Sequence, residues 1–257
     1  MRILRPLFDF YLQSSLHVGL AVLALLHGSF LQLHATCSQP LSLAVFWGTV
    51  LGYNCLKYAQ LFWSGKGKSA RYQAIAVCTA LAALGFMYQL WQLPRQVQQL
   101  LLGSGILVLV YPLLRRFGWL KLFFVSAAVT YITVFIPVSI LHKLDVSFVF
   151  LLLQRFFLLS SLLIPFEIWD SQFDETHLHT LPQRLGIRNT KLLGYGLLLP
   201  VLVLLAWQAD YQMVTVVVVA LAALSIYFTS LQRSIYYTSF WVESVPIVWW
   251  VVLLVMK

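Results

Sequence analysis

The chain has 257 residues, of which 61% are hydrophobic and 10% are charged. A soluble domain carries about 25% charged residues, and its surface-to-volume ratio leaves too much area exposed for so apolar a composition. This composition excludes a water-soluble protein and predicts an integral membrane protein. In a soluble protein, the net charge of +9 would indicate a nucleic-acid partner. In a membrane protein, an excess of basic residues is instead explained by their enrichment in cytoplasmic loops.

The N-terminal segment has two features of a secretory signal peptide. Arg2 and Arg5 precede an apolar run from Leu16 to Leu33. However, Asp9 lies before that run, and the run is long enough to cross a bilayer. We therefore expect a retained first transmembrane helix.

Apolar segments that approach the bilayer-spanning length of about 20 residues recur along the whole chain. Turn residues separate them, for example Ser38-Gln39-Pro40, Ser64-Gly65-Lys66-Gly67 and Arg116-Phe117-Gly118. We expect a single all-α polytopic domain, residues 1–257, with about nine transmembrane helices around a central cavity. The predicted segments are 16–34, 41–63, 72–92, 97–114, 119–141, 146–168, 191–208, 212–231 and 237–256.

Basic residues gather on one side of this topology. The N-terminus and every second loop share a side, and that side carries Arg2, Arg5, Lys66, Lys68, Arg71, Arg115, Arg116, Lys121, Arg184, Arg188, Lys191 and Arg233. The other side carries only Arg95, Lys143 and Lys257. The positive-inside rule places the first group in the cytoplasm. We expect a bacterial inner-membrane protein with a cytoplasmic N-terminus, an extracytoplasmic C-terminus and no nucleic-acid partner.

An acidic stretch begins the longest predicted loop, at about 169–190. The sequence EIWDSQFDETHLHTLPQRLG, residues 167–186, holds four of the eight acidic residues of the chain. If the sixth helix continues past the membrane surface, Glu167, Asp170, Asp174 and His177 share one helical face. Two aspartates one turn apart can hold a divalent cation together with phosphate oxygens. The alternative is a solvated helix end whose acids pair with the basic residues Arg184, Arg188 and Lys191.

The same stretch resembles a known motif. Asp170-x-x-x-Asp174, followed by Thr180-Leu181-Pro182 and Gly186, is similar to the second aspartate motif of the UbiA superfamily of intramembrane prenyltransferases. The helix number, the cytoplasmic N-terminus and the long loop after the sixth helix are similar as well. The resemblance implies a UbiA-like fold and transfer of a prenyl group from a polyprenyl diphosphate to an apolar, aromatic or lipid acceptor. It also implies that Asp170 and Asp174 bind Mg²⁺.

The sequence departs from the family at the first motif, N-D-x-x-D-x-x-x-D. Asn54 aligns with the asparagine, but Cys55, Tyr58 and Phe62 occupy the three aspartate positions. The spacer before Thr180 is also one residue shorter than the commonest form. Half of the metal-binding apparatus of the family is therefore missing.

Lys57 lies one turn after Asn54, and an ionisable group inside a span is costly and usually functional. Its ammonium can contact a diphosphate in place of a metal, or neutralise Asp170 and Asp174. A purely structural pair in a retired site is the alternative. The candidate catalytic residues are thus Asp170, Asp174 and Lys57, and the candidate substrate contacts are Asn54, Tyr58, Arg184 and Lys191.

Arg155 lies halfway along the sixth segment and needs a partner inside the membrane. Glu243 in the last segment and a ligand in the central cavity are the two candidates. We expect a structural pair with Glu243.

Other functions compete with prenyl transfer to an acceptor. A terpene cyclase uses the same ionisation without a separate acceptor. A non-catalytic UbiA-like scaffold would bind a lipid, quinone or pigment, or serve as a subunit of a membrane complex, and the missing first motif favours it. A CDP-alcohol phosphotransferase would need a D-G-x-x-A-R sequence, which is absent. The three cysteines form no C-x-x-C pair, which argues against a disulfide framework or a thiolate zinc site.

Overall fold

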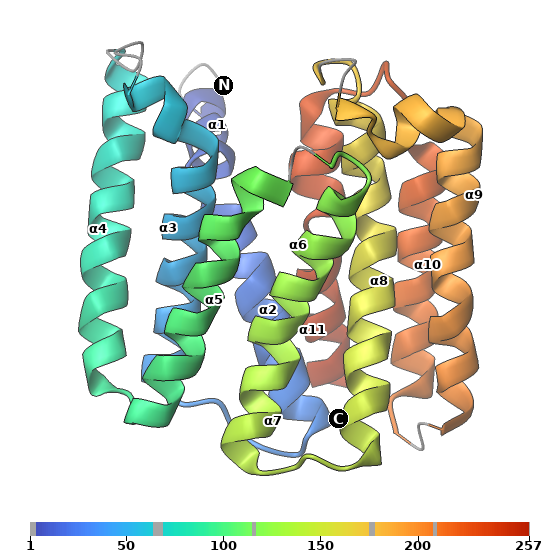
Figure 1. The fold of residues 1–257 in the computed structure, drawn as a ribbon. Coiled ribbons are helices and arrows are strands. Elements are labelled where there is room, and N and C mark those ends of the chain that lie inside the picture. Colours follow the sequence, from blue (N-terminus) through green and yellow to red (C-terminus); the bar gives the residue numbers. More distant parts are fainter. Residues whose placement is uncertain (1–3, 64–68, 115–116, 175–177, 208–209, 257) are drawn as a thin grey trace.

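The computed structural model describes residues 4–63, 69–114, 117–174, 178–207 and 210–256. The predicted turn at 64–67, the basic residues at 66, 68, 115 and 116, His177 and the side chain of Phe62 lie outside this description. The helices of the described chain run side by side in one bundle (Figure 1). The N-terminus lies at the same end as the α5–α6 and α8–α9 connections, and the C-terminus lies at the opposite end.

Each of the nine predicted segments falls on helix. The elements are α1 (Leu4–Gln13), α2 (Leu16–Gln32), α3 (Gln39–Trp63), α4 (Ala70–Gln92), α5 (Arg95–Leu114), α6 (Leu120–Thr130), the π-helix η1 (Tyr131–Phe135), α7 (Ile136–Leu141), α8 (Val146–Asp170), α9 (Leu181–Leu204), the 3-10 helix η3 (Leu205–Trp207), α10 (Gln212–Phe228), the π-helix η4 (Tyr237–Val242) and α11 (Val245–Val255).

Within the described ranges, six helices are long and apolar enough to cross a membrane. A seventh span results if α1 and α2, which meet at a bend of 57°, are one span. Helix α3, with 25 residues, and the shorter apolar helix α10, with 17, run beside them (Figure 1). These apolar helices make the protein an integral membrane protein, as the composition predicts.

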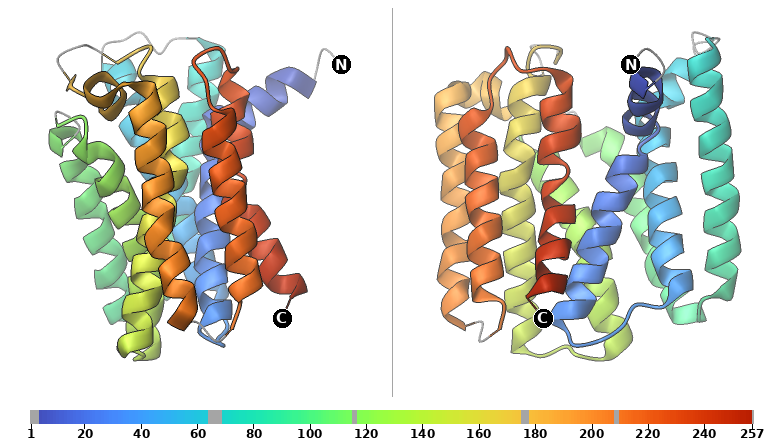
Figure 2. Two further views of the ribbon diagram at one scale, coloured as in Figure 1. Left: turned by 90° about the vertical axis from the view of Figure 1, so that its right-hand side faces the viewer. Right: turned by 180° about the vertical axis from the view of Figure 1, so that it is seen from behind.

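The helices close into a ring. Helix α2 packs on α3, α3 on α5, α5 on α6, α6 on α8, α8 on α10 and α10 on α11, and α11 returns to α2. Helix α4 packs against α3, and α9 packs against α8 and α10 (Figure 2). Leu84 and Trp91 on α4 and Leu109 on α5 are exposed, as expected where lipid tails replace water. First and last spans are therefore neighbours. The regular elements of the described ranges are all helices, which confirms the expected all-α architecture.

Arg155 on α8 is fully buried and lies where the ring closes. Its Nη1 donates a hydrogen bond to the carbonyl of Leu25 at 3.1 Å. Its Nη2 donates to Ser29 Oγ at 3.0 Å and to Gln32 Oε1 at 3.2 Å. The guanidinium also lies 4.3 Å from the ring centroid of Trp249 on α11. One side chain thus joins α8 to the first and the last span.

The predicted pairing of Arg155 with Glu243 is wrong. Neutral oxygens of α2 and the face of an aromatic ring hold the guanidinium instead. Arginine suits this role because its planar guanidinium donates hydrogen bonds in several directions. Its positive charge is also attracted to the face of an indole ring.

The bend between α1 and α2 lies just before the predicted segment 16–34, which corresponds to α2. Ser15 has a left-handed backbone, with φ of 59°, which is uncommon outside glycine and breaks the helix at this residue. Tyr236 Oη donates to Asp9 Oδ1 at 2.6 Å, which gives the acid before the run a partner. Figure 2 shows α1 set at an angle to α2 at the N-terminal end of the bundle.

The connection before α6 packs against the connection before α9. The Gly118 N–H donates to the carbonyl of Leu178 at 3.0 Å. A Cβ added at Gly118 would lie 2.3 Å from the same oxygen, so this approach requires glycine. The contact brings the start of α6 to the end of α8.

We predict that Gly118→Ala destabilises the protein by about 1–3 kcal/mol, because the new methyl group forces the two connections apart. The matched control is Gly105→Ala in α5, where a Cβ meets nothing within 4 Å. Thermal unfolding of both variants in detergent micelles measures the difference. Equal melting temperatures for the two variants would contradict the prediction.

We also predict that Arg155→Met destabilises the protein by about 2–5 kcal/mol, because it leaves buried oxygens on α2 without a donor. Arg95→Met is the control, because Arg95 is exposed. Thermal unfolding again provides the measurement. A loss no greater than that of the control would show that ring closure does not depend on the guanidinium.

Candidate functional site

The acidic stretch begins inside the last turn of α8. The helix ends at Asp170, and the Asp174 N–H donates to the Asp170 carbonyl at 3.1 Å. The expected continuation of the sixth helix is therefore limited to one further turn. That turn keeps Asp174 one turn beyond Asp170, as the i, i+4 spacing predicts.

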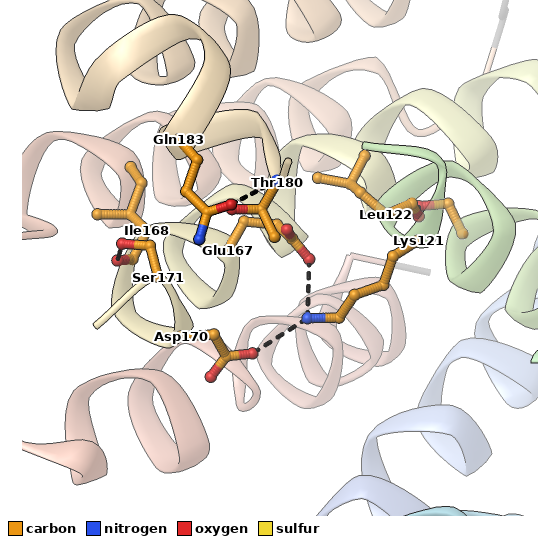
Figure 3. A network of polar contacts seen from close by, with 9 residues as sticks. Lys121, Leu122, Glu167, Ile168, Asp170, Ser171, Thr180 and Gln183 are labelled. Carbon is orange, nitrogen blue, oxygen red and sulfur yellow. Dashed lines mark hydrogen bonds and ion pairs between the residues drawn. The ribbon is translucent and has the colours of Figure 1, made fainter. Parts of the chain in front are cut away.

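Lys121 is the cation at the centre of this acidic group (Figure 3). Its Nζ lies 3.2 Å from Glu167 Oε1 and 3.3 Å from Asp170 Oδ2. Lys121 sits in the first turn of α6, which the Gly118–Leu178 contact holds beside the end of α8. Its side chain is 16% exposed, so most of the ammonium's surroundings are protein. The sequence indicated Lys121 only as one of many cytoplasmic charges.

The two carboxylates that contact Lys121 differ in exposure. Glu167 is 3% exposed, whereas 41% of the Asp170 side chain is exposed. Glu167 Oε2 is buried and has no hydrogen-bond partner in the described chain. The site therefore consists of one buried and one half-exposed carboxylate, which share one lysine. The half-exposed carboxylate, that of Asp170, is the one that solvent can reach.

The segment after the acidic turn starts α9 earlier than expected. The Thr180 N–H donates to Gln183 Oε1 at 3.0 Å, one half of a capping box, and Pro182 occupies the first turn. Gly186, with φ of 76°, bends the helix after that turn. Helix α9 thus begins at Leu181 instead of residue 191, and the loop is shorter than predicted. Gln183 Nε2 also donates to the Asp174 carbonyl at 3.3 Å, which ties the acidic turn to α9.

The basic residues of α9 do not pair with the acids in the way the alternative hypothesis expected. Lys191 Nζ donates to the carbonyls of Tyr227 and Thr229, at 3.0 and 2.6 Å. Lys191 therefore satisfies the last carbonyls of α10. Arg184 and Arg188 are exposed. Among the described ion pairs, Lys121 alone holds the acids of α8.

Lys57 on α3 is within electrostatic range of one acid of this group, Asp170. It interacts electrostatically with Glu243 first, and also with Asp170 and Arg71. The side chain is exposed, and the charged groups that act on it come from α4, α8 and the last span. Lys57 is therefore within electrostatic range of Asp170, whose ion-pair partner is nevertheless Lys121.

Asn54 and Tyr58, the other candidates on α3, contact the α1–α2 bend. Ser15 Oγ donates to Asn54 Oδ1 at 2.8 Å, and Asn54 Nδ2 donates to the Ser14 carbonyl at 3.1 Å. Tyr58 Oη donates to the Gln13 carbonyl at 2.8 Å. Both side chains are buried, and these bonds hold the bend in place. The structure therefore does not bring Asn54 and Tyr58 together with the acidic group.

Two further polar residues of the ring interior were missed by sequence reasoning. Tyr53 on α3 interacts electrostatically with Glu243, Tyr111 and Lys121. Glu243 interacts electrostatically with Lys57. The one indication in the sequence was that Glu243 is an acid inside an apolar span, and we expected it to pair with Arg155. Tyr53 is therefore within electrostatic range of Lys121, and Glu243 is within electrostatic range of Lys57.

The carboxylates at the end of α8 can supply some of the ligands of a hard cation, but not a complete set. Carboxylate oxygens are ligands that Mg²⁺ prefers, and it usually takes only one or two of them plus substrate phosphates. The buried, unpartnered Glu167 Oε2 is a free acceptor at the site. Over the ranges that the structure describes, no group of three His, Cys, Asp or Glu side chains has the geometry to hold a metal alone. The donor set thus suits a cation that is completed by an anionic substrate.

Comparison with known proteins gives one family and one fold. A family model described as the UbiA prenyltransferase family matches residues 64–239. No curated protein sequence matches the chain. A solved structure described as "Structural and mechanistic insights into the biosynthesis of Digeranylgeranylglyceryl phosphate synthase in membranes" is similar, with a TM-score of 0.60 and 12% identity. The alignment covers 97% of this chain and 96% of that chain, and at this identity it shows the fold alone.

We predict that Lys121→Met destabilises the protein by about 3–5 kcal/mol, because Glu167 is left as an uncompensated buried charge. Adding Glu167→Gln should recover much of the loss, because the amide carries no charge. Thermal unfolding of the wild type, both single variants and the double variant completes the cycle. Strictly additive losses would mean that Lys121 and Glu167 do not stabilise each other.

Proposed function

The chain belongs to the UbiA prenyltransferase family, and we propose that it transfers a prenyl group from a polyprenyl diphosphate to an apolar acceptor, aromatic or lipid, inside the membrane. The observation that carries this proposal is the convergence of Lys121, Glu167 and Asp170 at one end of a ring of apolar helices. A charged headgroup can bind at that end while a prenyl chain extends between the helices.

Prenyl transfer requires stabilisation of a departing diphosphate. The bond between the prenyl C1 and the diphosphate oxygen breaks, and the electron pair stays on the diphosphate. Lys121 and Lys57 would supply two ammonium groups to stabilise that charge, and cations in a site of low dielectric constant are more effective than in water. We propose that both contact diphosphate oxygens. Lys57 would thereby supply part of the charge that the missing first motif does not.

The proposed metal is Mg²⁺, which Asp170 and Asp174 would hold. When bound, it supplies Lewis-acid stabilisation of the leaving group. Arg184, exposed in the first turn of α9, remains a candidate for a further diphosphate contact. For Asn54, Tyr58 and Lys191, the hydrogen bonds support a structural role, and we no longer propose them as substrate contacts.

The apolar surroundings of the site serve the same chemistry. An allylic cation that meets water forms an alcohol, so the reaction needs an interior from which water is excluded. The packed apolar side chains Leu122, Ile164 and Ile168 lie beside the acids on α6 and α8 and limit access from that side. Water would enter only from the charged end, where the diphosphate itself would sit.

We further propose that this charged end faces the cytoplasm of a bacterial inner membrane. Arg71, Lys121, Arg184 and Arg233 lie on the predicted cytoplasmic side. Prenyl diphosphates are water-soluble at their headgroup, so a cytoplasmic opening would admit them directly.

One observation favours a second candidate, the non-catalytic scaffold. Lys121 already neutralises the acids without a metal, as it would in a retired site. A scaffold would bind an apolar molecule within the ring but would show no Mg²⁺-dependent affinity for a diphosphate. The two candidates therefore differ in a binding measurement that needs no knowledge of the acceptor.

We predict that replacing Asp170 and Asp174 together with Asn weakens Mg²⁺-dependent binding of geranylgeranyl diphosphate by more than about tenfold, or 1.4 kcal/mol. The loss follows because amide oxygens carry no charge to hold the cation. Calorimetric titration of the protein in nanodiscs, with Mg²⁺ and with EDTA, gives the affinities. Asp210→Asn, which changes an exposed acid at the other end of the bundle, is the control.

Equal Mg²⁺-dependent affinity in the double variant and the wild type would refute the metal assignment. A wild type that binds no prenyl diphosphate with or without Mg²⁺ would favour the scaffold.

A further inference from the structure

Lys121 competes with the proposed metal for one carboxylate, that of Asp170. Its Nζ lies 3.2 Å from Glu167 Oε1 and 3.3 Å from Asp170 Oδ2, and Figure 3 shows the ammonium directed between the two side chains. The Gly118–Leu178 contact holds the first turn of α6 beside the end of α8, so the ammonium is kept at this position. The protein itself thus supplies a cation to the carboxylate on which the proposed metal depends.

The two cations weaken each other's binding. A Mg²⁺–oxygen bond is about 2.1 Å long, so an ion on the same Asp170 oxygen would lie within about 5.5 Å of the ammonium. Like charges at this separation repel, and the repulsion is stronger than in bulk water because only 16% of the Lys121 side chain is exposed. We therefore expect a low Mg²⁺ affinity as long as Lys121 stays on Asp170.

The two carboxylates hold Lys121 unequally. Glu167 is 3% exposed, and a buried carboxylate that loses its cation is strongly unfavourable. The Asp170 side chain is 41% exposed, so water can solvate it when the ammonium leaves. An ammonium has three N–H donors and can keep one partner while it changes another. Glu167 is therefore the fixed partner of Lys121, and Asp170 is the exchangeable one.

A diphosphate is suited to take the place of Asp170. Its oxygens are charged acceptors, which form the stronger class of hydrogen bond with an ammonium. The same oxygens are ligands that Mg²⁺ prefers. A bound diphosphate would thus draw Lys121 away from Asp170 and at the same time add ligands for the metal.

We propose that Lys121 is an exchangeable counter-ion that couples metal binding to diphosphate binding. Without substrate, its ammonium neutralises Asp170 and keeps the affinity for Mg²⁺ low. When a prenyl diphosphate binds, the ammonium moves from Asp170 to a phosphate oxygen, remains on Glu167, and leaves Asp170 free for the metal. The inference rests on the proposed function and adds an order of binding to it, with the diphosphate first. Such coupling is reciprocal, so each ligand strengthens the binding of the other.

The first test measures Mg²⁺ binding without substrate, so it does not depend on transfer. Glu167→Gln keeps Lys121 on Asp170, and Lys121→Gln combined with Glu167→Gln leaves Asp170 without its cation and Glu167 without a charge. Each protein is titrated with Mg²⁺ by calorimetry in nanodiscs, and thermal unfolding shows that it is folded. Lys143→Gln combined with Glu167→Gln is the matched control, because Lys143 is exposed and contacts the Leu33 carbonyl at the opposite end of the bundle.

We expect Lys121→Gln/Glu167→Gln to bind Mg²⁺ at least about tenfold more tightly than Glu167→Gln, because the repelling ammonium is gone. The control, Lys143→Gln/Glu167→Gln, should stay within about threefold of Glu167→Gln. Adding Asp170→Asn to Lys121→Gln/Glu167→Gln should remove the gain. A purely structural role for Lys121 would produce no gain in metal affinity.

The second test measures the exchange in the wild type. Mg²⁺ is titrated into the free protein and into the protein loaded with geranylgeranyl diphosphate. The Asp170→Asn/Asp174→Asn variant with the same donor gives the heat of Mg²⁺ binding to the donor alone. We expect the loaded wild type to bind Mg²⁺ at least about tenfold more tightly than the free protein.

Two outcomes overturn the inference alone. One is equal Mg²⁺ affinity in Glu167→Gln and Lys121→Gln/Glu167→Gln, which would show that Lys121 does not compete with the metal. The other is equal Mg²⁺ affinity in the free and the loaded wild type. A wild type that binds no geranylgeranyl diphosphate overturns the proposed function instead, and the titrations without substrate still decide whether Lys121 excludes Mg²⁺.

Discussion

A single buried guanidinium joins the helices at which the ring closes. Arg155 of α8 reaches both α2 and α11, the two helices that are first and last in the ring. Lys57, Lys121, Asp170 and Glu243 stand on separate helices, and they converge only if the ring is closed. Lipid gives no hydrophobic force between helices, so hydrogen bonds and close packing must hold them. The proposed site at one end therefore requires helix contacts that Arg155 helps to make toward the other.

The sequence predicts the helices well because bilayer thickness imposes a length and a composition on each. It predicts that Asp170 and Asp174 lie one turn apart because their spacing is local in the chain. It fails for contacts between helices. Lys121 is 49 residues from Asp170 and looks like any cytoplasmic charge, and nothing near it in sequence reveals that Gly118 packs against Leu178.

Arg155 and Glu243 also show that contacts between helices could not be predicted from the sequence. Opposite charge made them natural partners, yet neutral carbonyl and hydroxyl oxygens hold the arginine while a lysine interacts with the acid. The presence of a buried charge predicts that it has partners, but it does not identify those partners. Asn54 and Tyr58 aligned with a binding motif and instead contact a helix bend, because a break such as Ser15 cannot be foreseen from an apolar run.

The π-helix before Glu243 sets the rotational phase of the last span. A regular α-helix advances by about 100° per residue, and a π-turn accommodates one residue more before the phase resumes. At its first residue Tyr237 Oη donates to the Ser225 carbonyl at 2.6 Å, and beyond its end Trp249 lies against the Arg155 guanidinium. Removing one residue from this turn would rotate one anchor relative to the other by about 100°. Residue number, as well as residue type, is therefore constrained in this short segment.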